Sequence, residues 1–347
     1  MERLVDRMAQ AMRDYDPVRE PPKARDGYSY SEPALGLLEW MPHASDGTIT
    51  IKVVGYHPNN PRHHKLPTIV STLSAYDAHN GHLLGVADGT LLTALRTGAA
   101  SAIASRIFAK PESSVLGLIG TGAQAVTQLH AVSRYFPLER VLVFDTDDAA
   151  LASFAGRVAP FGLDVSIEPA PIRDIVEQSD ILSTATSIGV NEGPLFDGVE
   201  TKPWLHINAV GSDFPGKFEV PLDHLRAALV VPDFTDQAVR EGECQRLTGD
   251  EIGPSLDMVL KDPEAFMKHR ASSTVFDSTG WALWDAVALS MVLDDAEKLG
   301  LGTPMPIESL PSDPRNPYER LTTGSGKLDA NQTTSGESNR PAASAEL

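Results

Sequence analysis

Cysteine and long apolar runs are both scarce in this chain of 347 residues. Cys244 is the single cysteine, which excludes an internal disulfide framework and is typical of proteins from a reducing compartment. No stretch approaches the roughly 20 consecutive apolar residues that a membrane-spanning helix needs. Residues 1–14 mix charged and apolar side chains, unlike a secretory signal. The sequence therefore predicts a cytoplasmic protein without a membrane partner.

Positive charge is also in short supply. The chain has 29 lysine and arginine residues against 47 aspartate and glutamate residues, which gives a formal net charge of −18. A surface of this sign repels nucleic acid and attracts cationic solutes, although it also serves simply to keep a protein in solution. We expect no nucleic-acid partner, and a small cationic substrate would suit the charge.

The first third of the chain predicts a helix, several strands and a long helix. Residues 2–13 place apolar side chains at helical spacing, and 48–56 alternate as a strand does, with Ile51 on one face and Lys52 on the other. Two further strands, 68–76 and 82–87, flank Asn80-Gly81, a pair that favours a hairpin turn. The helix expected over 91–109 is rich in small residues, which let another backbone approach closely.

From residue 115 the pattern changes to alternating strands and helices. Apolar runs occur at 115–119, 141–144, 181–184, 205–210 and 228–231, with amphipathic segments between them. This alternation predicts βαβ units and a parallel sheet. A helix is expected over 281–299, and the Ser/Thr/Gly-rich stretch 322–347 is typical of a disordered tail.

A glycine-rich turn joins the first of these runs to a helix. Val115–Ile119 leads directly into the sequence Gly-x-Gly-x-x-Ala at Gly120, Gly122 and Ala125. The first glycine permits a tight turn, the second lets a pyrophosphate approach the backbone, and the helix N-terminus offers free N–H groups. The pattern predicts a dinucleotide site in a Rossmann-type domain.

Asp145 ends the next strand, about where an acid that binds the adenosine ribose is expected. A carboxylate there repels a 2′-phosphate, so the sequence favours NAD over NADP. The alternative is that Asp145 caps a turn, because the segment Asp145–Asp148 could cap the next helix.

In its motifs the chain resembles the ornithine cyclodeaminase/mu-crystallin family, and within it the lysine cyclodeaminase branch. The resemblance covers residues 1–299 and rests on long motifs, which are Leu38–Pro42, Ile51–Tyr56, Leu91–Ser101, Ile119–Gln124, His206–Asp213 and Val275–Ser278. It implies an α/β fold in which a Rossmann-type parallel-sheet domain, 112–280, is inserted into an α+β substrate-binding and dimerisation domain, 1–111 plus 281–321. A homodimer is expected. Trp284 stands where relatives usually have an acid.

The activity implied by the resemblance is a cyclodeamination that uses NAD as a recycled cofactor. L-Lysine would give L-pipecolate, or L-ornithine would give L-proline, with ammonia released through hydride abstraction from Cα and its return. The two substrates differ by one methylene, a difference too small for sequence to settle. Other members of the family are cyclic-imine reductases and opine-type amino-acid dehydrogenases, and some relatives are binding proteins. These remain the alternatives.

The resemblance also implies roles for individual residues. Asp213 is the expected proton acceptor, and the α-carboxylate would be held by Lys52, Arg96 and Arg25, with Lys23 as an alternative to Arg25. Glu39 would meet the substrate's amine. The residues expected at the cofactor are Thr68, Arg96, Gly120, Gly122, Ala123, Gln124, Asp145, Thr186, Val210, Gly211, Ser212, Asp213, Lys217 and Ser278.

Several of these residues have a simpler structural explanation. Lys52 could be a solvated lysine on the outer face of a sheet, Asp213 a loop cap, and Glu39 a salt-bridged structural acid. No metal site is expected, because His57, His63 and His64 lack metal-ligand spacing. No Gly-x-Ser-x-Gly motif for a nucleophilic serine occurs.

Overall fold

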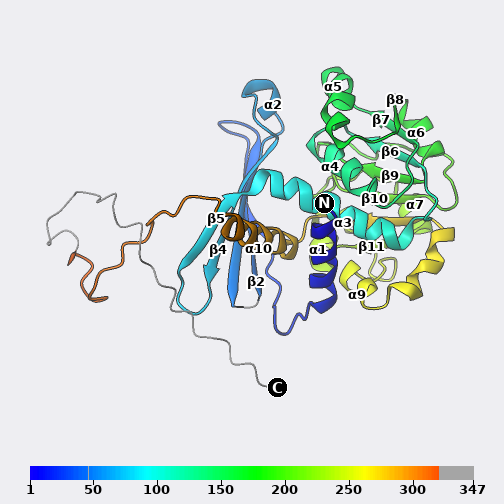
Figure 1. Ribbon diagram of the computed structural model, residues 1–347. Coiled ribbons are helices and arrows are strands. Elements are labelled where there is room, and N and C mark those ends of the chain that lie inside the picture. Colours follow the sequence, from blue (N-terminus) through cyan, green and yellow to red (C-terminus); the bar gives the residue numbers. More distant parts are fainter. Residues whose placement is uncertain (46, 320–347) are drawn as a thin grey trace. The chain divides into compact units, whose positions relative to one another are not determined.

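A computed structural model of the chain describes residues 1–45 and 47–319 (Figure 1). Met1–Leu301 form one compact unit, which holds the helices and strands named below, and Gly302–Leu347 are a second unit. No helix in the described part of the chain is long and apolar enough to cross a membrane. The tail predicted for 322–347 lies outside the described residues.

The α-helices are α1 (Glu2–Asp14), α2 (Asn60–His63), α3 (Gly89–Phe108), α4 (Ala123–Val132), α5 (Asp148–Val158), α6 (Ile172–Gln178), α7 (Leu222–Ala227), α8 (Thr235–Glu241), α9 (Leu256–Lys261) and α10 (Ala282–Leu299). Short 3₁₀ helices are η1 (Ala159–Phe161), η2 (Glu243–Arg246) and η3 (Pro263–Ala271). The strands are β1 (Asp26–Tyr30), β2 (Gly36–Ser45), β3 (Thr48–Tyr56), β4 (Ile69–Asp77), β5 (Leu83–Asp88), β6 (Val115–Ile119), β7 (Arg140–Phe144), β8 (Ser166–Pro169), β9 (Ile181–Thr184), β10 (His206–Ala209), β11 (Leu229–Pro232) and β12 (Thr274–Asp277).

The first five strands form an antiparallel sheet in the order β1-β2-β3-β4-β5. The strand predicted over 48–56 is β3, and its register places Lys52 opposite Met41 of β2 and Leu73 of β4. Helix α10 packs on this sheet, where Leu293 fills the space above Gly85. The buried face is the one that carries Lys52. Its solvated interpretation is therefore wrong, since Lys52 is 1% exposed.

The other seven strands form a parallel sheet in the order β11-β12-β10-β9-β6-β7-β8. The five predicted runs are five of these strands, whereas β8 and β12 were not predicted. The chain runs outward from β6 through β7 to β8, and in the other direction from β9 through β10. The strand order reverses between β6 and β9, and in such sheets ligands bind beyond the carboxyl ends at this point.

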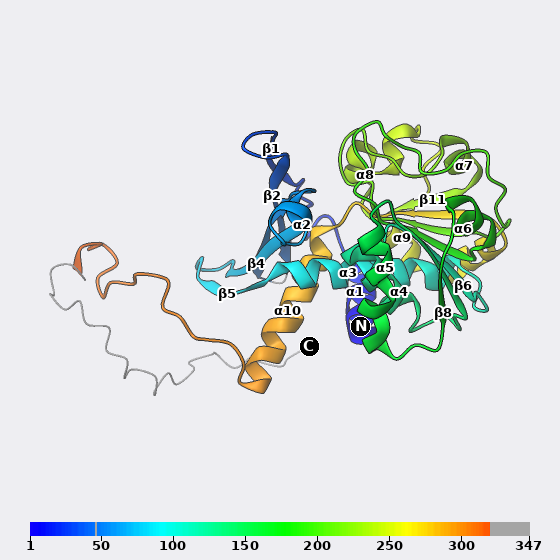
Figure 2. The same cartoon turned by 90° about the horizontal axis from the view of Figure 1, so that it is seen from above.

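Helix α3 links the two sheets and packs against elements of both (Figure 2). Asp88 caps its N-terminus, and the Asp88 carboxylate accepts hydrogen bonds from the backbone N–H groups of Thr90 and Leu91 at 3.0 Å each. The close approach predicted for its small residues occurs at Gly98, where an added Cβ would collide with the carbonyl oxygen of Thr127 in α4. Helix α1 packs on α3 and α10 in the same apolar core.

Candidate functional site

The glycine turn after β6 has the geometry that a dinucleotide needs. Gly120 has φ +91°, and a Cβ there would lie 2.5 Å from the carbonyl oxygen of Ala185, in the loop after β9. Gly122 precedes α4, and a Cβ on it would meet nothing within 4 Å. No side chain caps this helix, so its first N–H groups face an open space that suits a pyrophosphate.

Asp145 closes the same turn from β7. Its carboxylate accepts hydrogen bonds from the backbone N–H of Thr121 at 2.7 Å, from the Thr121 hydroxyl at 2.9 Å and from the backbone N–H of Asp147 at 2.9 Å. Asp147 is the residue that caps α5, through the N–H groups of Ala149 and Ala150. The cap of α5 is therefore Asp147, while Asp145 caps the turn that precedes this helix, as the alternative expected, and its carboxylate also stands beside the glycine turn.

A buried glutamate that sequence reasoning missed joins the next two loops. Glu219 accepts hydrogen bonds from the backbone N–H of Thr186 at 2.9 Å, from the Thr186 hydroxyl at 2.6 Å and from the backbone N–H of Gly211 at 2.9 Å. The Ser212 hydroxyl donates to the carbonyl oxygen of Lys217 at 2.7 Å. The loops after β9 and β10, where Thr186, Gly211 and Ser212 were expected at the cofactor, are thus held together.

Behind these loops lies a pair of buried acids, Glu243 and Asp277. Glu243 accepts from the backbone N–H of Glu219 at 2.6 Å, and Asp277 accepts from the backbone N–H of Cys244 at 2.8 Å. The other carboxylate oxygen of each acid is buried and has no hydrogen-bond partner in the described chain. Burial is the main cause that raises the pKa of Asp277 to about 7, and it raises the pKa of Glu243 well above its usual value.

This pair makes a testable prediction about stability. The folded-state pKa of Asp277 is about 7 against a reference of 3.8, so the folded state binds the proton more tightly than the unfolded chain does. The stabilisation that this proton gives the folded state is lost as pH rises through 7. Asp277→Asn mimics the protonated acid. Relative to wild type, the variant should gain about 2–3 kcal/mol of unfolding free energy between pH 5 and pH 8. Urea unfolding at the two pH values tests this, and an equal difference at both would contradict it.

A second cluster is buried where the antiparallel sheet meets α10. The ammonium group of Lys52 lies 2.8 Å from Oδ2 of Asp285, and Nε of Arg96 lies 3.1 Å from Oδ1 of the same carboxylate. Burial lowers the pKa of Lys52 to about 8. The pKa of Asp285 is below its usual range, because the two cations outweigh its burial. These three side chains together carry one positive charge in excess, and a further buried carboxylate, that of Asp233, lies within electrostatic range of Arg96.

Asp285 was not predicted as a site residue. The signal was an isolated acid in the otherwise apolar first turn of α10. The neighbouring Trp284 is fully buried, and its indole N–H lies 3.2 Å from the sulfur of Met12. The guanidinium group of Arg96 is 5.7 Å from the centre of its ring. Trp284 therefore packs against one of the two cations.

Arg25 carries a third cluster. Its Nε donates to Glu241 of α8 at 2.7 Å, its Nη2 donates to the carbonyl oxygen of Asp213 at 2.8 Å, and its Nη1 lies 3.9 Å from Glu39 of β2. The side chains of these three charged residues are only 10–18% exposed. Lys23, the alternative to Arg25, is exposed. Glu241 was not predicted, because it lies in a polar helix without a local signal.

Asp213 itself contacts a lysine and lies near a tyrosine. The ammonium group of Lys217 is 3.2 Å from Oδ1 of Asp213 and 3.4 Å from the hydroxyl oxygen of Tyr56, at the end of β3. It also lies 4.5 Å from the centre of the Tyr56 ring. These contacts join the parallel sheet to the antiparallel one. The expected residues Lys217 and Asp213 are thus brought together, and Tyr56 is an addition.

The remaining predicted residues are placed as follows. Ala123 begins α4, and Gln124 follows it. Val210 follows β10 and is 9% exposed. Ser278 follows β12, and its buried hydroxyl has no hydrogen-bond partner among residues 1–45 and 47–319. Thr68 precedes β4, and its carbonyl oxygen accepts from the N–H of His57 at 2.9 Å, so nothing in its own contacts distinguishes a cofactor role.

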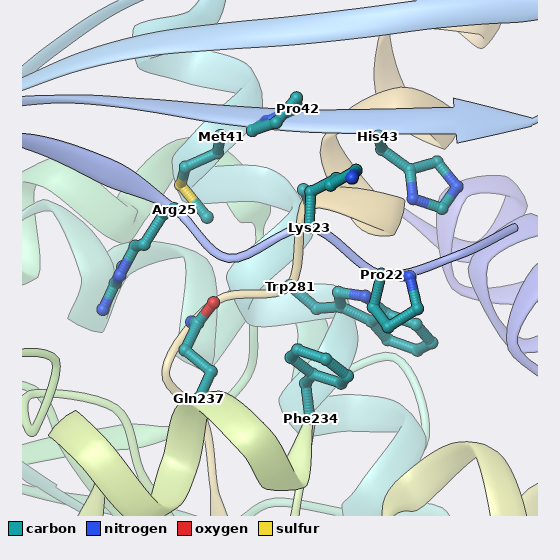
Figure 3. A pocket seen from close by; sticks show the side chains of 10 residues that line it. Pro22, Lys23, Arg25, Met41, Pro42, His43, Phe234, Gln237 and Trp281 are labelled. Atoms are coloured by element: carbon teal, nitrogen blue, oxygen red, sulfur yellow. The ribbon is translucent and has the colours of Figure 1, made fainter. Parts of the chain in front are cut away.

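A small pocket lies beside Arg25 (Figure 3). It is lined by Met41 of β2, Gln237 of α8 and Trp281, among others, and its volume of about 10 Å³ suits one water molecule. The rings of Trp281 and Phe234 stack beside it at 5.8 Å. The pocket is too small for an amino acid.

The sequence and fold that carry the glycine turn and these clusters are similar to those of known proteins. The profile of the ornithine cyclodeaminase/mu-crystallin family matches residues 1–299. The chain belongs to this family. The family resemblance expected from the motifs is thereby confirmed, as is its α/β fold, in which a Rossmann-type parallel sheet is inserted between the antiparallel sheet and α10.

Among members of the ornithine cyclodeaminase/mu-crystallin family, an L-lysine cyclodeaminase of Streptomyces rapamycinicus is 43% identical over 300 residues, which are 86% of this chain and 87% of that protein. A solved lysine cyclodeaminase structure, described as the basis for recognition of L-lysine, L-ornithine and L-2,4-diaminobutyric acid, is 48% identical with a TM-score of 0.88 and covers 92% of both chains. An archaeal alanine dehydrogenase dimer with bound NAD is 28% identical with a TM-score of 0.80, and covers 88% of this chain and 95% of that one.

Proposed function

We propose that this chain is an NAD-dependent cyclodeaminase that converts a basic amino acid, L-lysine first and L-ornithine second, into a cyclic amino acid and ammonia. The observation that carries the proposal is the buried cluster of Lys52, Arg96 and Asp285, whose net positive charge suits an α-carboxylate. The similarity to a lysine cyclodeaminase over most of both chains supports the choice of reaction.

The cofactor proposal rests on the turn after β6. The open space at Gly122, the uncapped start of α4 and the carboxylate of Asp145 fit a pyrophosphate and an adenosine ribose. When bound, NAD would supply a hydride acceptor and then a hydride donor for the substrate's Cα, so the overall reaction would involve no net oxidation. Ser278 brings a buried hydroxyl without a partner in the described chain, which is free to bond a ligand.

Side chains of this chain bind the substrate and transfer the proton. Lys52 and Arg96 bind the α-carboxylate and orient Cα, with Arg25 as a third cation. Glu39 meets an ammonium group of the substrate. Asp213 accepts a proton from the amine, and Lys217 holds its carboxylate in place at 3.2 Å.

The proposal is tested by incubating the protein with NAD⁺ and L-lysine, L-ornithine or L-2,4-diaminobutyrate separately. Mass spectrometry should find the cyclic product, with one ammonia released per product and no lasting change in absorbance at 340 nm. A lasting rise at 340 nm would identify a net dehydrogenase. Absence of any conversion of the three amino acids would reject the proposal.

The cofactor preference makes a further prediction, about Asp145→Ser. Removing the carboxylate takes away the ribose partner and frees the N–H groups of Thr121 and Asp147 for a 2′-phosphate. We expect the affinity for NAD to fall about 10–100-fold, the worth of a hydrogen bond to a charged group, and the NADP-to-NAD preference to rise. Cofactor titration measures both. Asp148 is an exposed acid of α5, and Asp148→Ser is the matched control. An unchanged cofactor preference in Asp145→Ser would contradict the prediction.

We also propose that the chain forms a homodimer through the outer face of the antiparallel sheet. This face exposes Val53, Val70, Leu84 and Val86, and Val53 and Val70 also line a groove of about 700 Å³. Exposed apolar patches of this kind mark protein interfaces. Val53→Asp should shift the protein from dimer to monomer in analytical ultracentrifugation. A wild-type protein that sediments as a monomer would refute the proposal.

A further inference from the structure

The proposed proton acceptor, Asp213, lies in a short loop that its own residues close. The carboxylate of Glu219, at one end of the loop, accepts a hydrogen bond at 2.9 Å from the backbone N–H of Gly211, at the other end. Within the loop, the Ser212 hydroxyl donates to the carbonyl oxygen of Lys217 at 2.7 Å, and the Lys217 ammonium group lies 3.2 Å from Oδ1 of Asp213. The closure by Glu219 therefore helps to set where the Asp213 carboxylate stands.

The same glutamate also ties this loop to its neighbour at the carboxyl edge of the parallel sheet. Oε2 of Glu219 accepts from Gly211, while Oε1 accepts from the backbone N–H and the hydroxyl of Thr186 at 2.9 and 2.6 Å. Thr186 lies in the loop after β9, which pairs with β10 and borders the point where the strand order reverses. The glycine turn packs on this loop as well, because a Cβ at Gly120 would lie 2.5 Å from the carbonyl oxygen of Ala185.

We infer that Glu219 is a positioning residue that holds Asp213 at a fixed place relative to the loop after β9, where the cofactor is expected. This inference rests on the proposed function, since it gives Glu219 a task only if Asp213 accepts the proton. Transfer between groups held by a protein depends steeply on their placement, and a displacement of 1 Å costs about 10²-fold in rate.

The burial of Glu219 supports this role. Its side chain is fully buried, and burial raises its pKa although the hydrogen bonds from Thr186 and Gly211 oppose the shift. Hydrogen bonds to a carboxylate are stronger than those to a neutral acceptor, so the two loops are held more firmly than an amide or a hydroxyl would hold them. Glu243 in turn accepts from the backbone N–H of Glu219 at 2.6 Å, which fixes the main chain that carries the carboxylate.

The fit between Glu219 and Gly211 leaves no room for a side chain. A Cβ on Gly211 would lie 2.2 Å from Oε1 of Glu219, and its three nearest atoms all belong to that carboxylate group. Gly211 is not among the glycines with positive φ, so alanine suits its backbone. Gly211→Ala therefore displaces the Glu219 carboxylate without removing its charge.

The test is a double-mutant cycle that combines Glu219→Gln or Gly211→Ala with Asp213→Asn. An amide has a single acceptor oxygen, so glutamine cannot accept from the N–H groups of both loops. Each of the first two variants should lower the rate of ammonia release at saturating L-lysine by about 10²-fold. In the Asp213→Asn background each should lower it by less than about threefold, because no proton acceptor remains to be displaced.

A second measurement is the affinity for NAD⁺, followed by cofactor titration. Its Kd should stay within about tenfold of wild type, the worth of one hydrogen bond, and so change far less than turnover. The matched control is Glu192→Gln. Glu192 is an exposed acid that accepts from the backbone N–H of Gly189 at 2.9 Å, also after β9. Its variant loses the same charge and should turn over as wild type does.

The outcomes separate this inference from the proposed function. An undiminished 10²-fold loss in the Asp213→Asn background would show a general lesion, and wild-type turnover of Glu219→Gln or Gly211→Ala would show that the closure is dispensable; either result overturns the inference. If Glu219→Gln fails to fold, as calorimetry would show, the same comparison is decided by Gly211→Ala. Failure of the proposed function has a different signature, because the wild-type protein would then release no ammonia from L-lysine.

Discussion

Asp213→Asn is expected to lower the rate of ammonia release from the substrate by about 10²–10⁴-fold, the contribution of a positioned proton acceptor. Asparagine has the size of aspartate and keeps an oxygen for the ammonium group of Lys217, 3.2 Å away, but it cannot take a proton from an amine. The affinity for NAD should stay close to that of wild type, since Gly122 and Asp145 hold the far end of the cofactor in our proposal. Steady-state ammonia release and cofactor titration measure the two quantities.

The control for this variant is Asp236→Asn. Asp236 is an exposed acid in the first turn of α8, so it carries the same charge change without a place near the proposed chemistry. Its turnover should equal that of wild type. Ammonia release by Asp213→Asn at the wild-type rate would show that another group accepts the proton. A parallel loss of NAD binding would instead assign Asp213 to the cofactor.

Much of the fold could be predicted, because its signals are local. The strand over 48–56 and the turn at Gly120 are set by alternation and by a glycine with positive φ. The strands β8 and β12 escaped prediction, since four residues carry too little periodicity to separate a strand from a loop. Which face of β3 is buried also depends on α10, some 230 residues later in the chain, so alternation alone left Lys52 ambiguous.

The site residues likewise fall into those that the sequence could predict and those that only tertiary packing brings together. Lys52, Arg96 and Asp213 could be proposed because they lie in long motifs, but their partners come from elsewhere in the chain. Asp285 and Glu241 lie in helices whose local pattern says nothing about which cation they meet. A hydrogen bond between residues 216 positions apart, such as that of Arg25 with Glu241, is a product of tertiary packing. Charge balance within the site therefore became visible only with the structure.

Asp285→Asn should be the most destabilising of the single substitutions considered for this chain. It leaves Lys52 and Arg96 buried without their shared carboxylate, and breaking a buried ion pair by removing one partner costs about 3–5 kcal/mol. The apparent Tm should fall by roughly 10 °C, measured by calorimetry at one protein concentration. Asp294→Asn, an exposed acid on the same helix, is the matched control and should leave Tm unchanged.

The cost of Asp285→Asn arises from unpaired positive charge, and three further measurements separate this cause from a simple packing defect. Lys52→Met alone should be milder, because it leaves Asp285 paired with Arg96, and added to Asp285→Asn it should restore part of the stability. The deficit should also shrink above pH 8, where Lys52, with a pKa of about 8, loses its proton even in wild type. Finally, an α-carboxylate that binds both cations would replace the missing anion, so saturating L-lysine should raise the Tm of the variant more than that of wild type. A deficit that is equal at pH 6 and pH 9 and indifferent to Lys52→Met would contradict the electrostatic explanation, and with it the surplus charge on which the proposed carboxylate site depends.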